Sequence, residues 1–176
     1  LLGVYGLGKC QRMILLLREA GYDAPVYLHG ALTGLCQLYR DLGIDLGETR
    51  PAMEAKPAEL RGALVLAPPS AQGTPWMKRF GADAVDAFAS GWMLVRGARR
   101  RRGVDRGFVM SDHADWPSLQ KAIGATGAER IIVTHGSTEV MVRWLCQQGL
   151  DAQVFATEYG ADDNEDDAAA APPMQA

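Results

Sequence analysis

Two histidines 22 residues apart, His113 and His135, each follow a run of apolar residues and could take part in catalysis. His113 stands between Asp112 and Asp115. Each apolar run predicts a buried strand that brings an imidazole to its carboxyl end, just before a helix. That edge of a parallel α/β sheet is where ligands bind. The spacing of the two histidines fits one strand-helix-strand step.

The chemistry open to each histidine depends on its neighbours. A carboxylate beside an imidazole can orient the ring and fix its tautomer, so His113, with Asp112 and Asp115, could act as a general acid or bind phosphate. In the alternative interpretation, Asp115 only caps the next helix. His135 could ligate zinc as a neutral imidazole or have a structural role. His29 also ends a predicted strand, but it lacks an acidic neighbour and is interpreted as structural.

Three further segments could hold phosphate groups. Lys9 follows a Gly-Leu-Gly turn into a helix, whose first turn can bind an anion, although the P-loop pattern is missing. Ser90 and Gly91 follow a predicted strand and could offer backbone N–H groups. Glycines flank a cluster of arginines, which predicts a projecting hairpin for a polyanionic partner or a solvated turn. The cluster consists of Arg96, Arg99, Arg100, Arg101, Arg102 and Arg106.

Composition and charge define the class of protein. The 176 residues suffice for one sizeable core, with 48% hydrophobic and 22% charged residues. The net charge of −3 includes six acidic residues after Thr157, so the rest of the chain carries +3. No apolar run approaches the roughly 18 residues of a membrane span, and no signal peptide is evident, so we expect a cytoplasmic protein without a membrane partner. Cys10, Cys36 and Cys146 are expected to be reduced core residues.

Strands and helices alternate along the predicted chain, which favours an α/β fold with a largely parallel sheet and helices on both of its faces. Strands are expected at 1–5, 25–29, 63–67, 82–89, 108–111, 130–134 and 152–156. Helices are expected at 9–20, 31–41, 76–80, from about 116, and from 137 to about 148, with Asp115 and Ser137 as caps. We expect residues 43–61 to form a polar connection and residues 161–176 to be a disordered acidic tail.

Four of these segments, in this order, resemble the metallo-β-lactamase-fold nucleases that contain a β-CASP domain. They are Tyr-Gly-Leu-Gly-Lys-Cys-Gln-Arg (5–12), Phe-Ala-Ser-Gly-Trp-Met (88–93), Met-Ser-Asp-His-Ala-Asp (110–115) and Val-Thr-His-Gly (133–136). The run from the Ser-Gly element through the arginines to His113 is most similar to the bacterial ligase-associated DNA exonucleases. The resemblance covers about residues 1–160.

The resemblance implies a fold, a reaction and site residues. Residues 1–90 would belong to the β-CASP domain and 91–160 to the end of the metallo-β-lactamase domain. Two zinc ions in the full-length enzyme would activate a water that attacks a phosphodiester of DNA, or of RNA. His135 would ligate zinc, and His113 would contact the phosphate and protonate the leaving oxygen. Lys9, Ser90, Gly91 and the arginines Arg99, Arg100, Arg101 and Arg102 would bind the substrate, and a DNA ligase is an implied partner.

One departure from the family pattern limits what this chain could do alone. The His-x-His-x-Asp-His box that supplies the family's main metal ligands is missing, since the chain has three histidines, none of them so spaced. The chain also begins with Leu1 in a strand-like run, so we expect an N-terminally truncated and inactive fragment. The alternatives are a non-catalytic nucleic-acid-binding module and a small α/β domain that binds a phosphorylated metabolite at Lys9 and Ser90.

Overall fold

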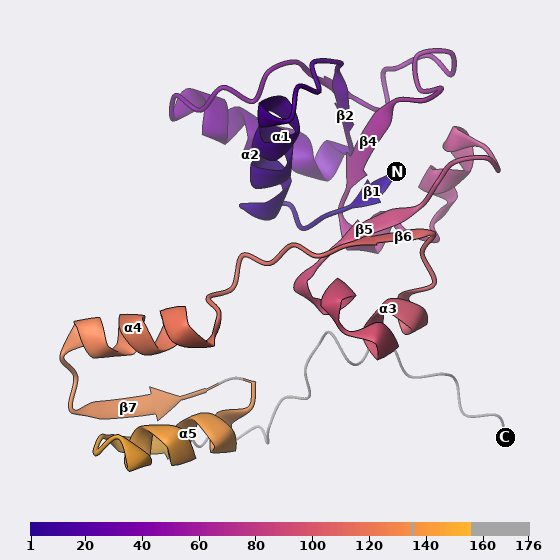
Figure 1. Ribbon diagram of the computed structural model, residues 1–176. Coiled ribbons are helices and arrows are strands. Elements are labelled where there is room, and N and C mark those ends of the chain that lie inside the picture. The colour runs from indigo at the N-terminus through magenta and orange to yellow at the C-terminus, as the bar shows by residue number, and fades with distance from the viewer. Residues whose placement is uncertain (135, 156–176) are drawn as a thin grey trace, which may run out of the picture. The chain divides into compact units, whose positions relative to one another are not determined.

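The computed structural model describes residues 1–134 and 136–155 and divides the chain into two compact units (Figure 1). Unit 1 comprises Leu1–Asp112, and unit 2 begins at His113. The predicted disordered tail, 161–176, lies outside the described residues. The domain boundary predicted between residues 90 and 91 was based on the family resemblance. The division into compact units does not test it, so it stays a prediction.

Unit 1 is an α/β fold with an all-parallel sheet of six strands in the order β3-β2-β4-β1-β5-β6. The strands are β1 (Leu2–Gly3), β2 (Val26–Leu28), β3 (Thr49–Pro51), β4 (Leu64–Ala67), β5 (Ala87–Ala89) and β6 (Arg106–Phe108). The helices are α1 (Lys9–Glu19), α2 (Gly30–Asp41), the short 3-10 turns η1 (Pro69–Ala71), η2 (Pro75–Phe80) and η3 (Gly91–Leu94), and α3 (Arg96–Arg102).

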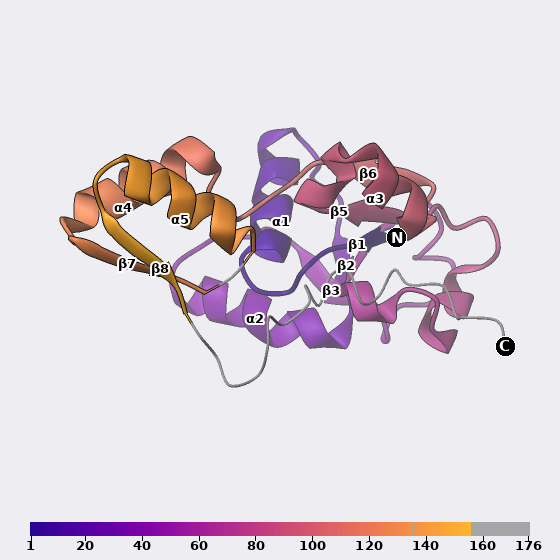
Figure 2. The ribbon, with the colours of Figure 1, turned by 90° about the horizontal axis from the view of Figure 1, so that it is seen from below.

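Side chains that alternate along the strands belong to two apolar clusters, one on each face of the sheet. Val26 and Leu28 of β2 join the larger cluster, which α1 and α2 cover with Cys10, Ile14, Leu32 and Cys36. Tyr27 between them points to the opposite face, where Trp76 and Phe80 of η2 cover it. The two layers are visible in Figure 2, in which α1 and α2 lie on one side of the strands. This arrangement confirms the prediction of a parallel sheet covered on both faces.

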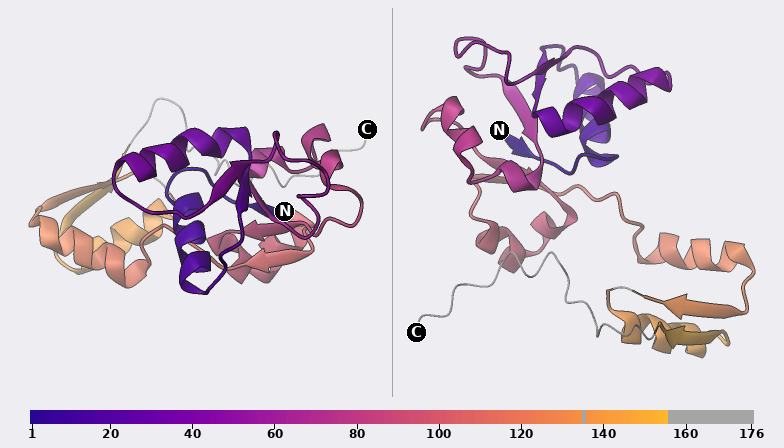
Figure 3. Two further views of the ribbon diagram at one scale, coloured as in Figure 1. Left: turned by 90° about the horizontal axis from the view of Figure 1, so that it is seen from above. Right: turned by 180° about the vertical axis from the view of Figure 1, so that it is seen from behind.

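Unit 2 contains a parallel pair of strands and two helices (Figure 3). Its elements are α4 (Trp116–Thr126), β7 (Arg130–Val133), α5 (Thr138–Gln147) and β8 (Asp151–Val154). The helices contact each other through Trp116 and Trp144, whose ring centroids are 5.6 Å apart, and through the Gln120 amide, which donates to the Met141 sulfur at 3.5 Å. Ile132 and Val154 of the two strands remain about half exposed.

The structure corrects several local predictions. The connection 43–61 contains strand β3, which has no apolar pattern because it is a short polar edge strand ending in Pro51. The strand predicted at 82–89 shortens to β5. Ser137 precedes α5 without a capping hydrogen bond from its side chain, and Cys146, predicted in the core, is exposed.

Candidate functional site at the carboxyl edge of the sheet

The loops that follow β1, β5 and β6 lie at one edge of the sheet and carry Lys9, Ser90, Gly91 and Asp112. Strands β1 and β5 are neighbours in the sheet. The chain leaves β1 through α1 towards β2 on one side, and it leaves β5 through η3 and α3 towards β6 on the other. Neighbouring strands whose connections diverge in this way form a topological switch point, the usual ligand crevice of open parallel sheets.

Lys9 begins α1 at this edge and is buried, with only 4% of its surface exposed. Its ammonium lies 4.0 Å from Asp112 Oδ2, beyond the end of β6, and 4.8 Å from the centroid of the Tyr5 ring. Burial of a lysine is costly unless the charge is paired, so Asp112 is the counter-ion that this position requires. The sequence analysis placed Asp112 beside His113, but its contact with Lys9 was not predicted.

Arg12, one turn further along α1, holds the same loop. Its guanidinium Nη1 donates to the carbonyl of Ser111 at 3.0 Å and lies 3.6 Å from Asp112 Oδ1. Sequence reasoning did not single out Arg12 as a site residue. Its position three residues after Lys9, on the same helical face, is the signal that could have revealed it. The two cations of α1 therefore fix the segment that leads directly into His113.

Ser90 and Gly91 make close contacts between β5 and β6. Ser90 is buried, and its hydroxyl accepts a hydrogen bond from Trp92 N at 3.3 Å, which caps η3. Its backbone N–H donates to Phe108 O at 3.0 Å. A Cβ on Gly91 would lie 3.2 Å from the Cβ of Ser111, so glycine lets the two loops approach closely. These contacts give both residues a structural role at the switch point.

The arginine run forms helix α3, so the prediction of a hairpin is wrong. Arginine is a good helix former, and Gly103, with φ 65°, ends the helix in the left-handed conformation. Arg102 packs back on the sheet, with its guanidinium carbon 4.1 Å from the Phe88 ring centroid and Nη2 donating to Gln72 Oε1 at 2.6 Å. Arg99, Arg100 and Arg101 are exposed, so they remain available to an anionic partner.

Asp115 caps helix α4 in unit 2. Its Oδ1 accepts a hydrogen bond from Ser118 N at 2.9 Å, and hydrogen bonds from the side chain and the backbone of Ser118 lower the pKa of the Asp115 carboxyl. The predicted cap is confirmed, and the orienting role towards His113 stays a prediction. His113 is the residue that follows the loop held by Lys9 and Arg12. His135 lies outside the described residues, so its predicted zinc ligation also stays a prediction.

His29 has the structural role that the sequence predicted. It is the N-cap of α2, where its Nδ1 accepts a hydrogen bond from Ala31 N at 3.1 Å. Its ring packs edge-on against Trp76, with 4.6 Å between centroids, and burial lowers the pKa of the imidazole. Neutral imidazole is the form that can accept this bond, so the lowered pKa and the cap favour the same state.

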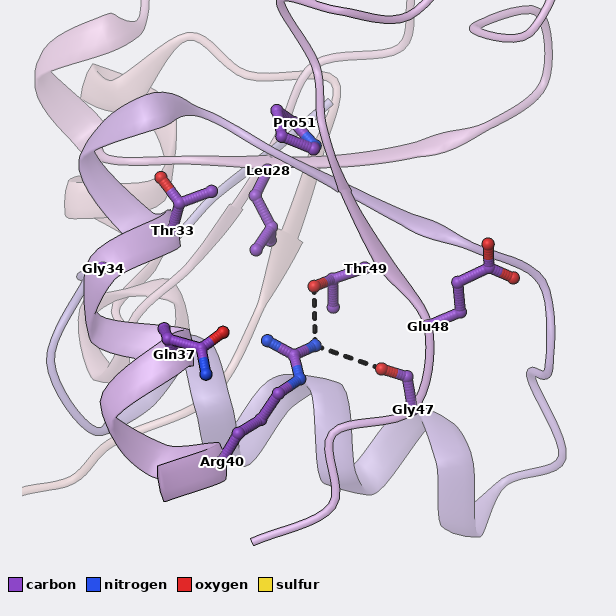
Figure 4. A pocket seen from close by; sticks show the side chains of 9 residues that line it. All are labelled: Leu28, Thr33, Gly34, Gln37, Arg40, Gly47, Glu48, Thr49 and Pro51. Atoms are coloured by element: carbon purple, nitrogen blue, oxygen red, sulfur yellow. Dashed lines mark hydrogen bonds between the residues drawn. The ribbon is translucent and has the colours of Figure 1, made fainter. Parts of the chain in front are cut away.

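A pocket of about 550 Å³ opens between α2 and β3 (Figure 4). Arg40 crosses it and donates through Nη2 to Gly47 O at 3.1 Å and to Thr49 Oγ1 at 2.7 Å. The pocket is lined by Leu28, Thr33, Gly34, Gln37, Arg40, Gly47, Glu48, Thr49 and Pro51. None of these residues belongs to the predicted site. The two hydrogen bonds of Arg40 connect α2 to the loop before β3 and to the first residue of that strand.

Comparison with known proteins gives one curated relative. A protein named "Probable DNA ligase" from Opitutus terrae (strain DSM 11246 / JCM 15787 / PB90-1) is 31% identical over 148 residues, which are 84% of this chain. The chain spans about 14% of the length of that relative. No protein-family profile matches the chain, and no solved structure matches it.

Proposed function

We propose that the chain forms part of a metal-dependent nuclease that hydrolyses phosphodiester bonds in DNA, of the metallo-β-lactamase/β-CASP class and closest to the ligase-associated DNA exonucleases. The order of the four motifs supports this assignment. A relative named DNA ligase, aligned over 84% of the chain, favours DNA over RNA as the substrate and makes a DNA ligase a plausible partner. Because the chain corresponds to a small part of that relative, both substrate and partner are proposals.

In this proposal residues 1–90, which lie within unit 1, belong to the β-CASP domain, and residues 91–160, which include the elements of unit 2, belong to the end of the metallo-β-lactamase domain. The parallel sheet of unit 1, with helices on both faces, is consistent with the first assignment. The half-exposed strands of unit 2 are consistent with the second, since a two-stranded sheet is only marginally stable unless further elements cover it.

The observation that carries the proposal is the contact of Lys9 and Arg12 with Asp112 at the switch point, immediately before His113 in the chain. Arg12 donates to the Ser111 carbonyl, and both Lys9 and Arg12 lie beside the Asp112 carboxylate. These contacts hold the segment that precedes His113 in the chain. In the proposed reaction, His113 donates its proton to the oxygen that leaves phosphorus as water attacks.

The described residues do not by themselves fit a zinc site. Within 1–134 and 136–155, no three His, Cys, Asp or Glu side chains lie close enough together to hold a metal ion. The proposed pair of zinc ions therefore needs donors besides these, with His135 as one of them. When bound, zinc would supply a hydroxide nucleophile near neutral pH.

The complete protein encoded by the gene provides the test. We expect His135→Ala to lower its zinc content, measured by mass spectrometry of the metal, and to abolish release of nucleotides from end-labelled DNA. His113→Gln should retain zinc and lose degradation. His29→Asn replaces an imidazole outside the site and serves as the control. Unchanged zinc content and unchanged degradation in His135→Ala would overturn the proposal.

A non-catalytic nucleic-acid-binding module is the second candidate. The exposed Arg99, Arg100 and Arg101 favour it, because this surface needs no metal to bind phosphates. It predicts DNA binding without degradation in the complete protein. The third alternative, a phosphorylated metabolite at Lys9 and Ser90, loses support because Lys9 is buried against Asp112 and the Ser90 hydroxyl caps η3. No helix among the described residues is long and apolar enough to cross a bilayer.

A further inference from the structure

The turn η3 exposes a tryptophan directly before the arginine helix. Trp92 has 49% of its surface exposed, and Leu94 and Val95 are exposed as well. Helix α3 begins at Arg96, immediately after them. The other three tryptophans each pack on an aromatic ring, whereas the Trp92 ring packs on none within 1–134 and 136–155. Because tryptophan is on average a well-covered residue, an exposed and unstacked indole indicates a contact surface.

Although its ring is exposed, the backbone of Trp92 is fixed. Its N–H donates to the Ser90 hydroxyl at 3.3 Å, and its carbonyl accepts a hydrogen bond from Val95 N at 3.0 Å. Met93, the next residue, is buried, and its sulfur would lie 2.8 Å from a Cβ on Gly107 of β6. The turn therefore packs closely on that strand. A large ring on a fixed backbone loses little conformational entropy when it binds a partner.

The charge around Trp92 has one sign. Residues 88–104 contain five arginines and no acidic residue. Four of these arginines are exposed, and none of the four forms an ion pair with a carboxylate in the described part of the chain. They are Arg96, Arg99, Arg100 and Arg101. Unpaired guanidinium groups beside a bare indole match a polyanion that also presents flat apolar faces.

A single strand of nucleic acid has both of these properties. Its phosphates are anionic, and its unstacked bases present faces on which an aromatic side chain can stack. In a duplex the same faces are covered by the neighbouring base pairs, so an exposed ring finds no base to stack on. Tryptophan and arginine are also enriched in protein–protein interfaces. A patch with four unpaired arginines and no acidic residue, however, fits a phosphate backbone better than a mixed protein surface.

We propose that Trp92 stacks on a base of single-stranded DNA whose phosphates contact the exposed arginines of α3. The choice of DNA rests on the proposed function, whereas the stacking role of Trp92 goes beyond it. The surface begins at the candidate site, because a Cβ on Gly91 would lie only 3.2 Å from the Cβ of Ser111. Ser111 belongs to the loop that Lys9 and Arg12 hold. A strand bound along η3 and α3 would therefore lead towards that loop.

Binding of fluorescently labelled oligonucleotides to the complete protein, measured by anisotropy, is the test. The probe is an oligothymidylate of about 15 nucleotides, the upper range of a single-strand site, with phosphorothioate linkages that resist hydrolysis. We expect Trp92→Ala to weaken binding of this strand by about 5- to 140-fold, the usual loss when one base-stacking ring is removed. Binding of the corresponding duplex should not change.

Matched controls separate stacking from charge and from folding. Leu94→Ala removes an apolar side chain of the same turn that is 76% exposed but cannot stack, so affinity should not change. Trp92→Phe keeps a ring and should bind the strand more tightly than Trp92→Leu, which keeps only apolar bulk. That pair remains informative if Trp92→Ala fails to fold. A strand with abasic residues in place of thymidine keeps its phosphates, so the wild type and Trp92→Ala should bind it equally.

Equal affinity of the wild type, Trp92→Phe and Trp92→Leu for the oligothymidylate would overturn the stacking role. Tighter binding of an oligouridylate, with the same dependence on Trp92, would overturn the choice of DNA. Failure of the proposed nuclease is a separate result, in which the complete wild-type protein leaves unmodified, end-labelled DNA intact. The comparison of Trp92 variants measures binding alone, so it keeps its meaning in that case.

Discussion

At the scale of single residues, His29 should make the stability of the protein depend on pH through its cap at the start of α2. Its neutral imidazole accepts the capping hydrogen bond from Ala31 N, and burial lowers its pKa in the folded protein. The unfolded chain therefore binds a proton at higher pH than the folded chain does. The stability that this residue contributes is fully present above the unfolded pKa of about 6.5, and it is lost as pH falls through the lowered folded pKa.

The His29→Asn variant isolates this effect. Asparagine is a good N-cap that does not titrate in this range, so the variant should match the wild type near neutral pH and lose less stability on acidification. His29→Ala should cost about 0.5–2 kcal/mol at neutral pH through loss of the cap. Urea unfolding at pH 7.5 and pH 5.5 measures both. An identical pH dependence in wild type and His29→Asn would show that this imidazole is not responsible.

Asp112 supports the buried charge of Lys9. Asp112→Asn removes the counter-ion while leaving the ammonium buried, so the free energy of unfolding should fall by about 1–3 kcal/mol. Lys9→Met in the same background removes the unpaired charge and retains the apolar stem, so it should recover part of the loss. Chemical denaturation of the two single variants and the double variant measures the coupling. Strictly additive effects would mean that the two residues do not interact.

At the scale of elements, helix α3 joins structural and exposed arginines in one run. Arg102 contacts Phe88 and Gln72, and Gln72 in turn donates to Asp86 Oδ1 at 3.0 Å. Arg102→Ala should therefore lower the free energy of unfolding by about 1–3 kcal/mol. Arg100→Ala, the matched control on the exposed side, should change it by less than about 0.5 kcal/mol. Equal effects in thermal unfolding would contradict this division of roles.

Under the proposed function, the Arg102→Ala and Arg100→Ala variants also distinguish an effect on protein stability from an effect on DNA binding. If Arg100 contacts a DNA phosphate, Arg100→Ala should weaken binding to all sequences alike. It should also reduce the slope of log affinity against log salt concentration by about 0.9. Fluorescence anisotropy over a range of salt concentrations measures this slope. Affinity and slope that are unchanged after substitution of Arg99, Arg100 and Arg101 together would remove α3 from the proposed DNA surface.

At the scale of the whole molecule, the two units differ in how well their strands are protected. Val65, Leu66 and Ala67 of β4 are buried in the middle of a six-stranded sheet, whereas Ile132 of β7 is half exposed in a sheet of two strands. We expect the amides of β4 to exchange with deuterium much more slowly than those of β7 and β8. Hydrogen exchange measured by mass spectrometry is the test, and equal protection in both units would contradict it.

Local pattern was sufficient for most of the element order and for the Asp115 cap. Apolar runs predicted the strands that became β2, β4 and β7, and a short polar side chain before an apolar helix predicted the Asp115 cap. These features depend on neighbours in the chain, so sequence alone specifies them. The neighbours of His135 and His113 allowed zinc ligation and an acid role beside structural ones, the resemblance favoured the former, and both stay predictions.

Tertiary structure decided where the charged residues lie. The sequence determined a parallel α/β fold with reactive residues after its strands, because side-chain period and capping are local properties. It did not determine that Lys9 pairs with Asp112 or that Arg102 packs on Phe88. Those contacts join residues far apart in the chain. They follow from strand order and from the cost of burying charge and polar groups, which only the assembled sheet imposes.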